Sequence, residues 1–454
     1  MPLISIRERG INHDGPVVAI DGQEYPLPQP LTPPFDERAE RELEWYFEEH
    51  LRFPFTHQVR AAEAGASIER YGKALFKQVF RDPDAYAEYR GLMRDGLETL
   101  TFDIIGGPDF QRLHWEALWD EKLPQPLALQ CTFVRRNIQP QIVRARVRTS
   151  PTINLLVVTA RPGGRNDVGY RTISRPLIGA LRQANVPVQV DILRPATYAA
   201  LVQHLEEKQD SAGAGYYHVI HFDVHGALLP FDRFDAMEEA LETSHLTYPT
   251  MQPQRFGRAR LAPYPGVKAF LFLESGAPGL ADPVEATELA DLLLTHQIPI
   301  AILNACQSGK YVQASVDSEQ WDSGESDSDL DESRSTQHAS RSTQETSLGS
   351  QLMAAGMQMV LAMGYSVTVS AAEIMMARLY GQLFVSGDVA AAIRAARLEL
   401  HNRKARRVYF NQQIELEDWL LPVVYENQRQ RLQTRDFTEE EANAYYEAQA
   451  NAYQ

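Results

Sequence analysis

Short apolar segments alternate with helical patterns from about residue 149 onward, and this alternation constrains the fold more than any other feature of the sequence. The first apolar segment, 153–158, is apolar at nearly every position, which is typical of a strand buried on both faces. In chain order, the first predicted strands and helices are 153–158, 176–184, 188–193, 198–207 and 217–222. The alternation predicts an α/β domain in which helices cover both faces of a mostly parallel sheet.

The same pattern continues to about residue 425 after one interruption. The later predicted strands are 270–273, 298–303, 359–363 and 419–425, and the later predicted helices are 283–297, 350–356, 371–384 and 389–401. Residues 316–346 interrupt the pattern with Ser, Asp and Glu and contain almost nothing apolar to bury. We therefore expect a mobile insertion within one domain.

A different pattern precedes residue 149. Alternating positions over 4–28 predict short hairpin strands, 40–50 and 67–80 predict helices, and 129–134 predicts a strand. We interpret 1–148 as a smaller α+β domain and 149–427 as the α/β domain. The polar residues 428–454 are predicted to form a solvated helix or an arm.

Charge and cysteine content exclude several classes of protein. The 454 residues include 44 Lys and Arg and 60 Asp and Glu, and the net charge of −16 disfavours broad nucleic-acid binding. Cys131 and Cys306 cannot build a disulfide framework, which suits a reducing cytoplasm. No segment stays apolar for the roughly 18 residues that a membrane span needs, and charges near the N-terminus argue against a signal peptide, so we expect neither membrane insertion nor export.

Two of the predicted strands end in residues that can carry chemistry. His225 and Gly226 follow the strand at 217–222, and Cys306 follows the strand at 298–303. Reactive groups of such sheets gather at the carboxyl ends of the strands. Cysteine chemistry needs a thiolate, a base and donors for an oxyanion, and Cys306, His225 and the N–H groups of Cys306 and Gly226 could supply all three. Taken singly, Cys306 could instead be inert packing and His225 a structural histidine.

Metal and cofactor sites are not predicted. His221, Asp223 and His225 occupy alternate positions that share a face of a strand, but they lack the helical arrangement of zinc peptidases. Residues 308–310 resemble the end of a phosphate-binding loop, but Asn304 stands where its first glycine should be.

The motif His-Phe-Asp-Val-His-Gly at 221–226, followed about 80 residues later by Asn-Ala-Cys-Gln-Ser-Gly, resembles the paired motifs of CHAT-domain peptidases. These enzymes are relatives of caspases and separase. Further segments resemble the same family over about 1–427, and they lie at 31–34, 71–76, 114–118, 155–162, 347–356 and 419–425. The resemblance implies a caspase-like fold preceded by a pseudo-protease-like half. It also implies a catalytic histidine at His225, a nucleophile at Cys306 and an oxyanion hole at Gly226 and Cys306.

The resemblance does not specify which residue the substrate carries before the cleaved bond. Metacaspases, which are related peptidases, carry an acidic residue two positions before the cysteine, and this sequence has Asn304 there. Asn304 and Asp223 are candidate substrate-binding residues, although Asp223 could equally fix the histidine strand by hydrogen bonding. The insertion at 316–346 resembles the cleaved linker of caspases, so Arg334 and Arg341 are candidate self-processing sites, with an inert solvated loop as the alternative.

The resulting functional prediction is a cytoplasmic cysteine endopeptidase that performs limited proteolysis of a protein partner. By analogy with the family, we expect a bacterial or antiviral defence or cell-death pathway, a gasdermin-like substrate, and a sensor or partner protein that activates the enzyme. The main alternative is a catalytically silent caspase-like scaffold that binds partners. A small-molecule-sensing α/β domain is the third possibility.

Overall fold

A computed structural model describes most of the chain. The described residues are 2–9, 15–28, 31–138, 145, 147–162, 171–184, 186–232, 234, 252–253, 258, 261–275, 280–305, 347–408, 412–427 and 431–452. The predicted insertion at 316–346 lies outside these residues.

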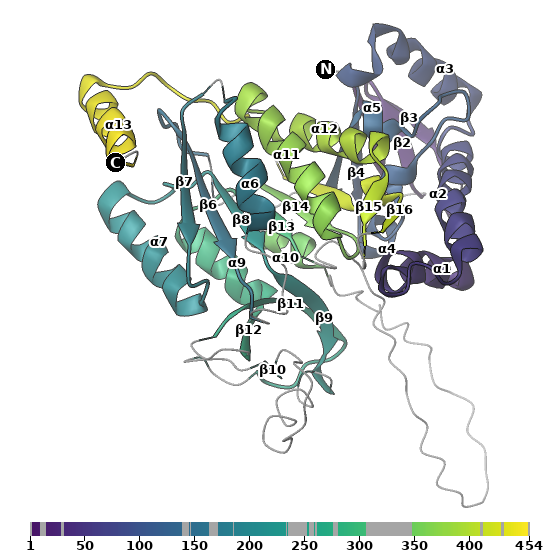
Figure 1. Ribbon diagram of the computed structural model, residues 1–454. Coiled ribbons are helices and arrows are strands. Elements are labelled where there is room, and N and C mark those ends of the chain that lie inside the picture. Colours follow the sequence, from purple (N-terminus) through teal and green to yellow (C-terminus); the bar gives the residue numbers. More distant parts are fainter. Residues whose placement is uncertain are drawn as a thin grey trace, which may run out of the picture.

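A large, mostly parallel sheet forms the centre of the molecule, as the alternation predicts (Figure 1). Three neighbouring pairs, β3–β2, β2–β1 and β14–β17, are antiparallel, and the other pairs are parallel. In sheet order the eleven strands are β3 (Gln23–Pro26), β2 (Val17–Ile20), β1 (Leu3–Arg7), β4 (Thr101–Gly106), β5 (Thr132–Asn137), β17 (Pro422–Glu426), β14 (Met359–Met363), β13 (Ile300–Asn304), β8 (Val219–Asp223), β6 (Ile153–Thr159) and β7 (Val188–Leu193).

Helices cover both faces of the C-terminal part of this sheet. Along β6, Leu155 and Val157 belong to one core, whereas Leu156 and Val158 belong to the other, because successive side chains of a strand point to opposite faces. The first core is closed by α6 (Arg171–Leu181), α11 (Val369–Ser386) and α12 (Val389–Asn402), and the second by α7 (Tyr198–Ala212), α9 (Ala286–Thr295) and α10 (Leu348–Ala355). The strands are therefore apolar on both faces, which explains their continuous apolar runs.

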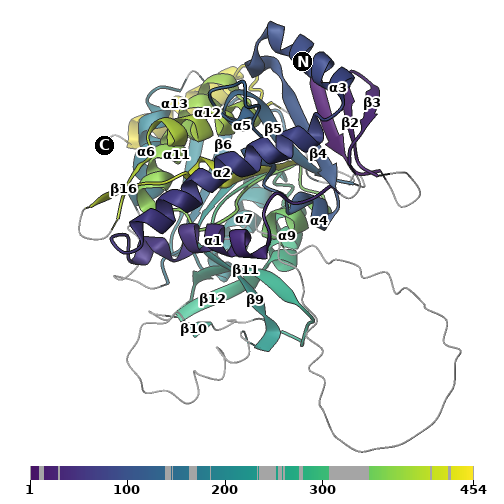
Figure 2. The ribbon, with the colours of Figure 1, turned by 90° about the vertical axis from the view of Figure 1, so that its right-hand side faces the viewer.

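The N-terminal part contributes five strands to the same sheet, and its helices lie beside them (Figure 2). These helices are α1 (Glu37–Glu48), η1 (His50–Arg52), α2 (Gln58–Val79), α3 (Pro83–Leu92), η2 (Met93–Asp95), η3 (Leu97–Thr99), α4 (Pro108–Gln111), η4 (Trp115–Ala117) and α5 (Leu127–Gln130). The hairpin of β2 and β3 turns at Asp21 and Gly22, which both have positive φ, as a tight two-residue turn requires. Pairing of β5 with β17 makes the sheet continuous across residues 148 and 149, where we predict a domain boundary.

The remaining elements lie near the C-terminus. They are the hairpin of β15 (Ala405–Arg407) and β16 (Gln413–Glu415), η7 (Asp418–Leu420) and α13 (Glu439–Ala452). The Arg435 N–H donates to the Ser150 carbonyl at 3.1 Å, which ties the segment before α13 to the start of the α/β region. Within the described ranges, none of the helices has both the length and the apolar character needed to cross a bilayer.

A second, four-stranded sheet is the main departure from the sequence prediction. It projects beneath the large sheet in both views and contains β10 (Gln252–Pro253), β12 (Leu280–Glu285), β11 (Val267–Glu274) and β9 (His225–Pro230). The predicted strand at 270–273 exists, but its expected place in the parallel sheet is wrong. The predicted helix at 283–297 begins only at Ala286, because residues 281–285 pair antiparallel with β11.

Two other predicted strands begin later than expected. Residues 127–130 form the single turn of α5, so the strand expected at 129–134 begins at Thr132. Residues 418–420 form η7, so the strand expected at 419–425 begins at Pro422. In both cases the apolar side chains are buried in helical turns, and an apolar run alone does not distinguish such a turn from a strand.

A buried ionic cluster holds β5 to the C-terminal part of the molecule. Glu116, in η4, pairs with the Arg135 guanidinium of β5, and its Oε1 lies 3.7 Å from the Arg397 guanidinium of α12. Arg397 also donates to the Pro422 carbonyl at 2.6 Å. Burial alone would raise the pKa of Glu116, but the two guanidinium groups more than offset this effect and leave the pKa below its usual value.

A buried histidine lies within the first core. His221 of β8 is fully buried, and its Nδ1 forms a hydrogen bond with the Tyr380 hydroxyl of α11. Its Nε2 has no hydrogen-bond partner among the described residues. Burial, and secondarily the charge of Arg161, lower the pKa of His221 to about 3. The imidazole is therefore neutral at ordinary pH.

Replacement of Glu116 by Gln should destabilise the fold strongly. Two buried guanidinium groups would lose their counter-charge, and we expect a loss of about 3–5 kcal/mol of unfolding free energy in urea titrations. Glu69→Gln is the matched control, because Glu69 pairs with Lys73 on an exposed face of α2 and should cost less than about 1 kcal/mol. Equal losses in the two variants would contradict the importance of the cluster.

His221 should make stability depend on pH. Its folded pKa lies below that of the unfolded chain, so its contribution is complete above about pH 6.5 and declines toward pH 3, by up to about 1.4 kcal/mol per pH unit. In urea titrations between these values, His221→Gln should show a smaller slope of stability against pH than the unmodified protein. Tyr380→Phe retains the buried imidazole and should retain the slope. An unchanged slope in His221→Gln would refute the assignment.

Candidate active site

The two strands that precede the predicted reactive residues are direct neighbours. β8 and β13 pair in parallel, with Asp223 opposite Asn304, so both strands end at the same edge of the sheet. The Val224 N–H donates to the Asn304 carbonyl at 3.4 Å, which extends the pairing past the end of β8. His225 follows Asp223 by two positions, and Cys306 follows Asn304 by two positions.

His225 stands where the chain passes from the large sheet into the small one. It is the first residue of β9 and pairs with Phe272 of β11, while Gly226 pairs with Leu271. The side chain is half-buried. The histidine is thus held between two sheets with part of its surface accessible.

Asp223 is enclosed by hydrogen-bond donors. It is only 4% exposed, and its carboxylate accepts from the Arg161 guanidinium on one oxygen and from the Asn304 amide at 2.8 Å on the other. Burial raises the pKa of Asp223, and Arg161 and the Asn304 hydrogen bond offset part of this rise. With both oxygens occupied, this carboxylate is better placed to fix the histidine strand than to bind a substrate cation. Asn304 is half-buried beside it.

Arg161 is a residue of the site to which the sequence analysis assigned no role. It follows the carboxyl end of β6. Its guanidinium donates to the Asp223 backbone carbonyl at 2.7 Å, and its backbone N–H donates to the Glu274 carboxylate at 2.9 Å. The second oxygen of Glu274 accepts from the Ala196 N–H at 3.2 Å. These bonds connect β6, β8 and β11. Its place at a strand end, in a segment that resembles the CHAT motif, was the available signal.

The N-terminal part also reaches this edge of the sheet. β14 runs parallel to β13, so the loop after Met363 leaves the sheet on the same side as β8 and β13. Glu48 of α1 accepts hydrogen bonds from both the N–H, at 3.0 Å, and the hydroxyl of Ser366 in this loop. Tyr365 is buried against Phe47 of α1, with ring centroids 5.2 Å apart. Local sequence patterns contain no signal for these contacts.

Other predicted residues fall outside the described part of the chain. Cys306 directly follows Ala305, after which residues 306–346 are outside it, and these include Arg334 and Arg341. Cys131 is described, and it is fully buried with a thiol pKa raised by burial, which disfavours a reactive thiolate. Across the described ranges, no three His, Cys, Asp or Glu side chains gather closely enough to hold a metal ion.

Comparisons with known proteins address the family of this chain. No curated protein matches the sequence. Among solved structures, two Saccharomyces cerevisiae separase–securin complexes align at 9% identity, with TM-scores of 0.33 and 0.34 over 77% and 90% of this chain. This chain spans only 17% and 20% of those separase chains. The sequence model of the CHAT domain matches residues 69–432, which is most of the chain. The chain therefore belongs to the CHAT domain family.

Proposed function

We propose that this protein is a cysteine endopeptidase in which Cys306 and His225 form the catalytic dyad. The observation that carries the proposal is the register of β8 on β13. Asp223 and Asn304 pair in parallel strands, and each lies two residues before a member of the proposed dyad. The two members therefore follow neighbouring strand ends at one edge of the sheet. Membership of the CHAT family supports the same chemistry.

In the proposed reaction, the Cys306 thiolate attacks the carbonyl carbon of the scissile peptide bond. The N–H groups of Gly226 and Cys306 stabilise the oxyanion that forms. His225 then donates a proton to the leaving amine, the C–N bond breaks, and a thioester remains on Cys306. Water, deprotonated by His225, hydrolyses this thioester and releases the new carboxylate.

The hydrogen-bond network around Asp223 would hold the chain next to the proposed dyad in a fixed position. Arg161 and Asn304 hold the carboxylate, and His225 follows it by two residues on the same chain. A charged group that is itself fixed by hydrogen bonds needs no reorganisation as charge develops nearby. The network therefore supports a positioning role for Asp223 and Asn304, and substrate selection would involve other groups at this edge.

The substrate class and setting rest on the family resemblance. We propose limited proteolysis of a protein partner, for which a gasdermin-like pore former is a candidate, in a bacterial defence or cell-death pathway controlled by a sensor protein. A reducing cytoplasm would keep the Cys306 thiol available. Cleavage at Arg334 or Arg341 would make the insertion a self-processed regulatory loop.

Labelling with a peptide that carries a thiol-reactive group tests the dyad. The unmodified protein and Cys131→Ala should be labelled, whereas Cys306→Ala should not, because Cys131 is buried with a raised thiol pKa. In a peptide-library cleavage assay, Cys306→Ala should be inactive and His225→Ala should lose about 100- to 10,000-fold of the rate. Intact masses of the same samples report self-processing.

Two results would contradict the peptidase. Equal labelling of Cys306→Ala and Cys131→Ala would show that Cys306 is not selectively reactive. Full cleavage activity in His225→Ala would remove the histidine from the mechanism. Absence of both labelling and cleavage would instead favour a catalytically silent scaffold.

Replacement of Asn304 by Asp tests the positioning role. Asp cannot donate to Asp223 when ionised, and two carboxylates would face each other across the present 2.8 Å contact. A shared proton raises the pKa of such a pair, so the loss of stability should be small near pH 4 and grow as the pH rises, to about 1–3 kcal/mol.

Asn304→Ala is the matched control, because it removes the donor without adding a charge. Its loss of stability should also grow as Asp223 ionises, because the Asn304 bond favours the carboxylate, but at pH 8 the loss should be smaller than that of Asn304→Asp, since no second charge is added. If Asn304→Asp is as stable as the unmodified protein at pH 8 and gains a preference for Arg or Lys in the cleavage assay, Asn304 is a specificity residue and the positioning role is wrong.

A further inference from the structure

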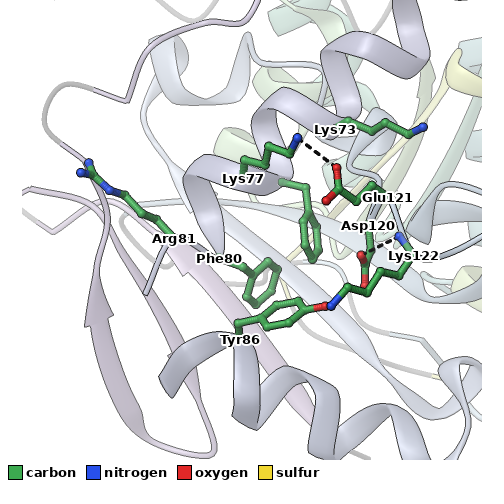
Figure 3. A pocket seen from close by; sticks show the side chains of 9 residues that line it. Lys73, Lys77, Phe80, Arg81, Tyr86, Asp120, Glu121 and Lys122 are labelled. Atoms are coloured by element: carbon green, nitrogen blue, oxygen red, sulfur yellow. Dashed lines mark hydrogen bonds and ion pairs between the residues drawn. The ribbon is translucent and has the colours of Figure 1, made fainter. Parts of the chain in front are cut away.

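A cavity of about 370 Å³ lies in the N-terminal part, between α2, α3 and the segment after η4 (Figure 3). Its volume falls in the range of about 300–1,000 Å³ that is usual for small-molecule sites. The cavity is built from helices and a segment that the candidate active site does not use. The residues that line it are Lys73, Phe76, Lys77, Phe80, Arg81, Tyr86, Asp120, Glu121 and Lys122.

Aromatic side chains form the inner wall. Phe76 and Phe80 are each only 6% exposed, and their ring centroids lie 4.7 Å apart. Tyr86 is half-buried, with its ring centroid 6.3 Å from that of Phe76. Figure 3 shows Phe80 and Tyr86 on the side of the cavity opposite Lys77 and Glu121. A planar apolar ring can pack against such a wall.

Cationic groups surround the mouth. The Lys122 ammonium lies 4.9 Å from the centroid of the Tyr86 ring, and the structure shows it in no ion pair with a described residue. Lys77 is 2.9 Å from Glu121, but both side chains are more than half exposed, so this pair is weak and exchangeable. Arg81 stands at the rim and extends outward in Figure 3.

The charge of the lining contrasts with that of the whole chain. Four cationic and two anionic side chains give the lining a formal charge of +2, whereas the protein carries −16. The negative charge of Asp120 is partly offset by the Arg90 guanidinium, which lies 3.9 Å from its carboxylate, and Asp120 also accepts hydrogen bonds from the Tyr89 hydroxyl and the Lys122 N–H. A local positive site within an acidic protein attracts small anions.

We propose that this cavity binds a small anionic ligand with a planar aromatic ring, which is the chemistry of a nucleoside monophosphate. The ring packs against Phe80 and Tyr86, and the anionic group accepts charge-assisted hydrogen bonds from Lys77 and Lys122. Such a ligand bridges α2 and residues 120–122. The Trp119 N–H already donates to the Gly72 carbonyl at 3.2 Å, so binding reinforces an existing contact between these segments.

Isothermal titration of the full chain with adenosine monophosphate, inorganic phosphate and adenosine tests the proposal. Adenosine monophosphate should bind saturably, and more tightly than either of its parts, because only the nucleotide engages both walls. Lys122→Gln and Tyr86→Leu should each weaken this binding by about tenfold or more. Urea titrations check that both variants remain folded.

Lys208→Gln is the matched control. Lys208 pairs with Asp191 at 2.9 Å and lies 4.9 Å from the Tyr216 ring centroid, which reproduces the surroundings of the cavity lysines at a distant site. This variant should bind the nucleotide as the unmodified protein does. The proposal is wrong if the nucleotide does not bind at millimolar concentration, if phosphate alone binds equally well, or if Lys208→Gln weakens binding as much as Lys122→Gln.

Discussion

Parallel pairing of β8 with β13 is the interaction on which the candidate active site depends. Adjacent parallel strands end at one edge, so residues far apart in the chain leave the sheet side by side. The hydrogen bond from the Asn304 side-chain amide to Asp223 favours the observed register of β13 on β8. A shift of one residue would place Leu303, whose side chain has no donor, opposite the carboxylate. A buried carboxylate that lost this donor would keep only Arg161 as a side-chain partner and would be less fully compensated for its desolvation, so the register and the position of His225 are maintained together.

Packing and buried charge explain two residues of the N-terminal motif segments, Gly72 in 71–76 and Glu116 in 114–118. At Gly72, a Cβ atom would lie 1.8 Å from the Ala117 carbonyl oxygen, so α2 can approach η4 only with glycine there. Glu116, next to Ala117, supplies the counter-charge for Arg135 and Arg397. Among the described residues of the large sheet, β5 and β17 pair only through Arg135 and Tyr425, so the ionic cluster strengthens the junction where strand pairing is shortest.

Local sequence patterns predicted the elements that a segment's own residues specify. They failed where pairing with a strand far away in the sequence decides the structure. The predicted strand at 188–193 coincides with β7, because alternation of β-branched apolar residues with polar ones is a property of the segment itself. Residues 283–285 fit a helix by pattern, but β11 is available as a pairing partner and makes them part of β12. The role of Arg161 depends on contacts with Asp223 and Glu274, which lie far away in the sequence, so its position at a strand end indicated a site residue but not its partners.

For the proposed peptidase, the structure favours substrate selection by surfaces of this edge that face outward. Each oxygen of the buried Asp223 carboxylate already accepts a hydrogen bond, one from Arg161 and one from Asn304. The loop after β14 is one of these surfaces, since β14 ends at the same edge. Glu48 holds Ser366 of this loop, and Phe47 covers Tyr365, so α1 determines the shape of the loop. Without α1, a buried tyrosine would be exposed and two hydrogen bonds would be lost. In the proposed peptidase, the N-terminal part therefore contributes to the site by supporting the loop at this edge.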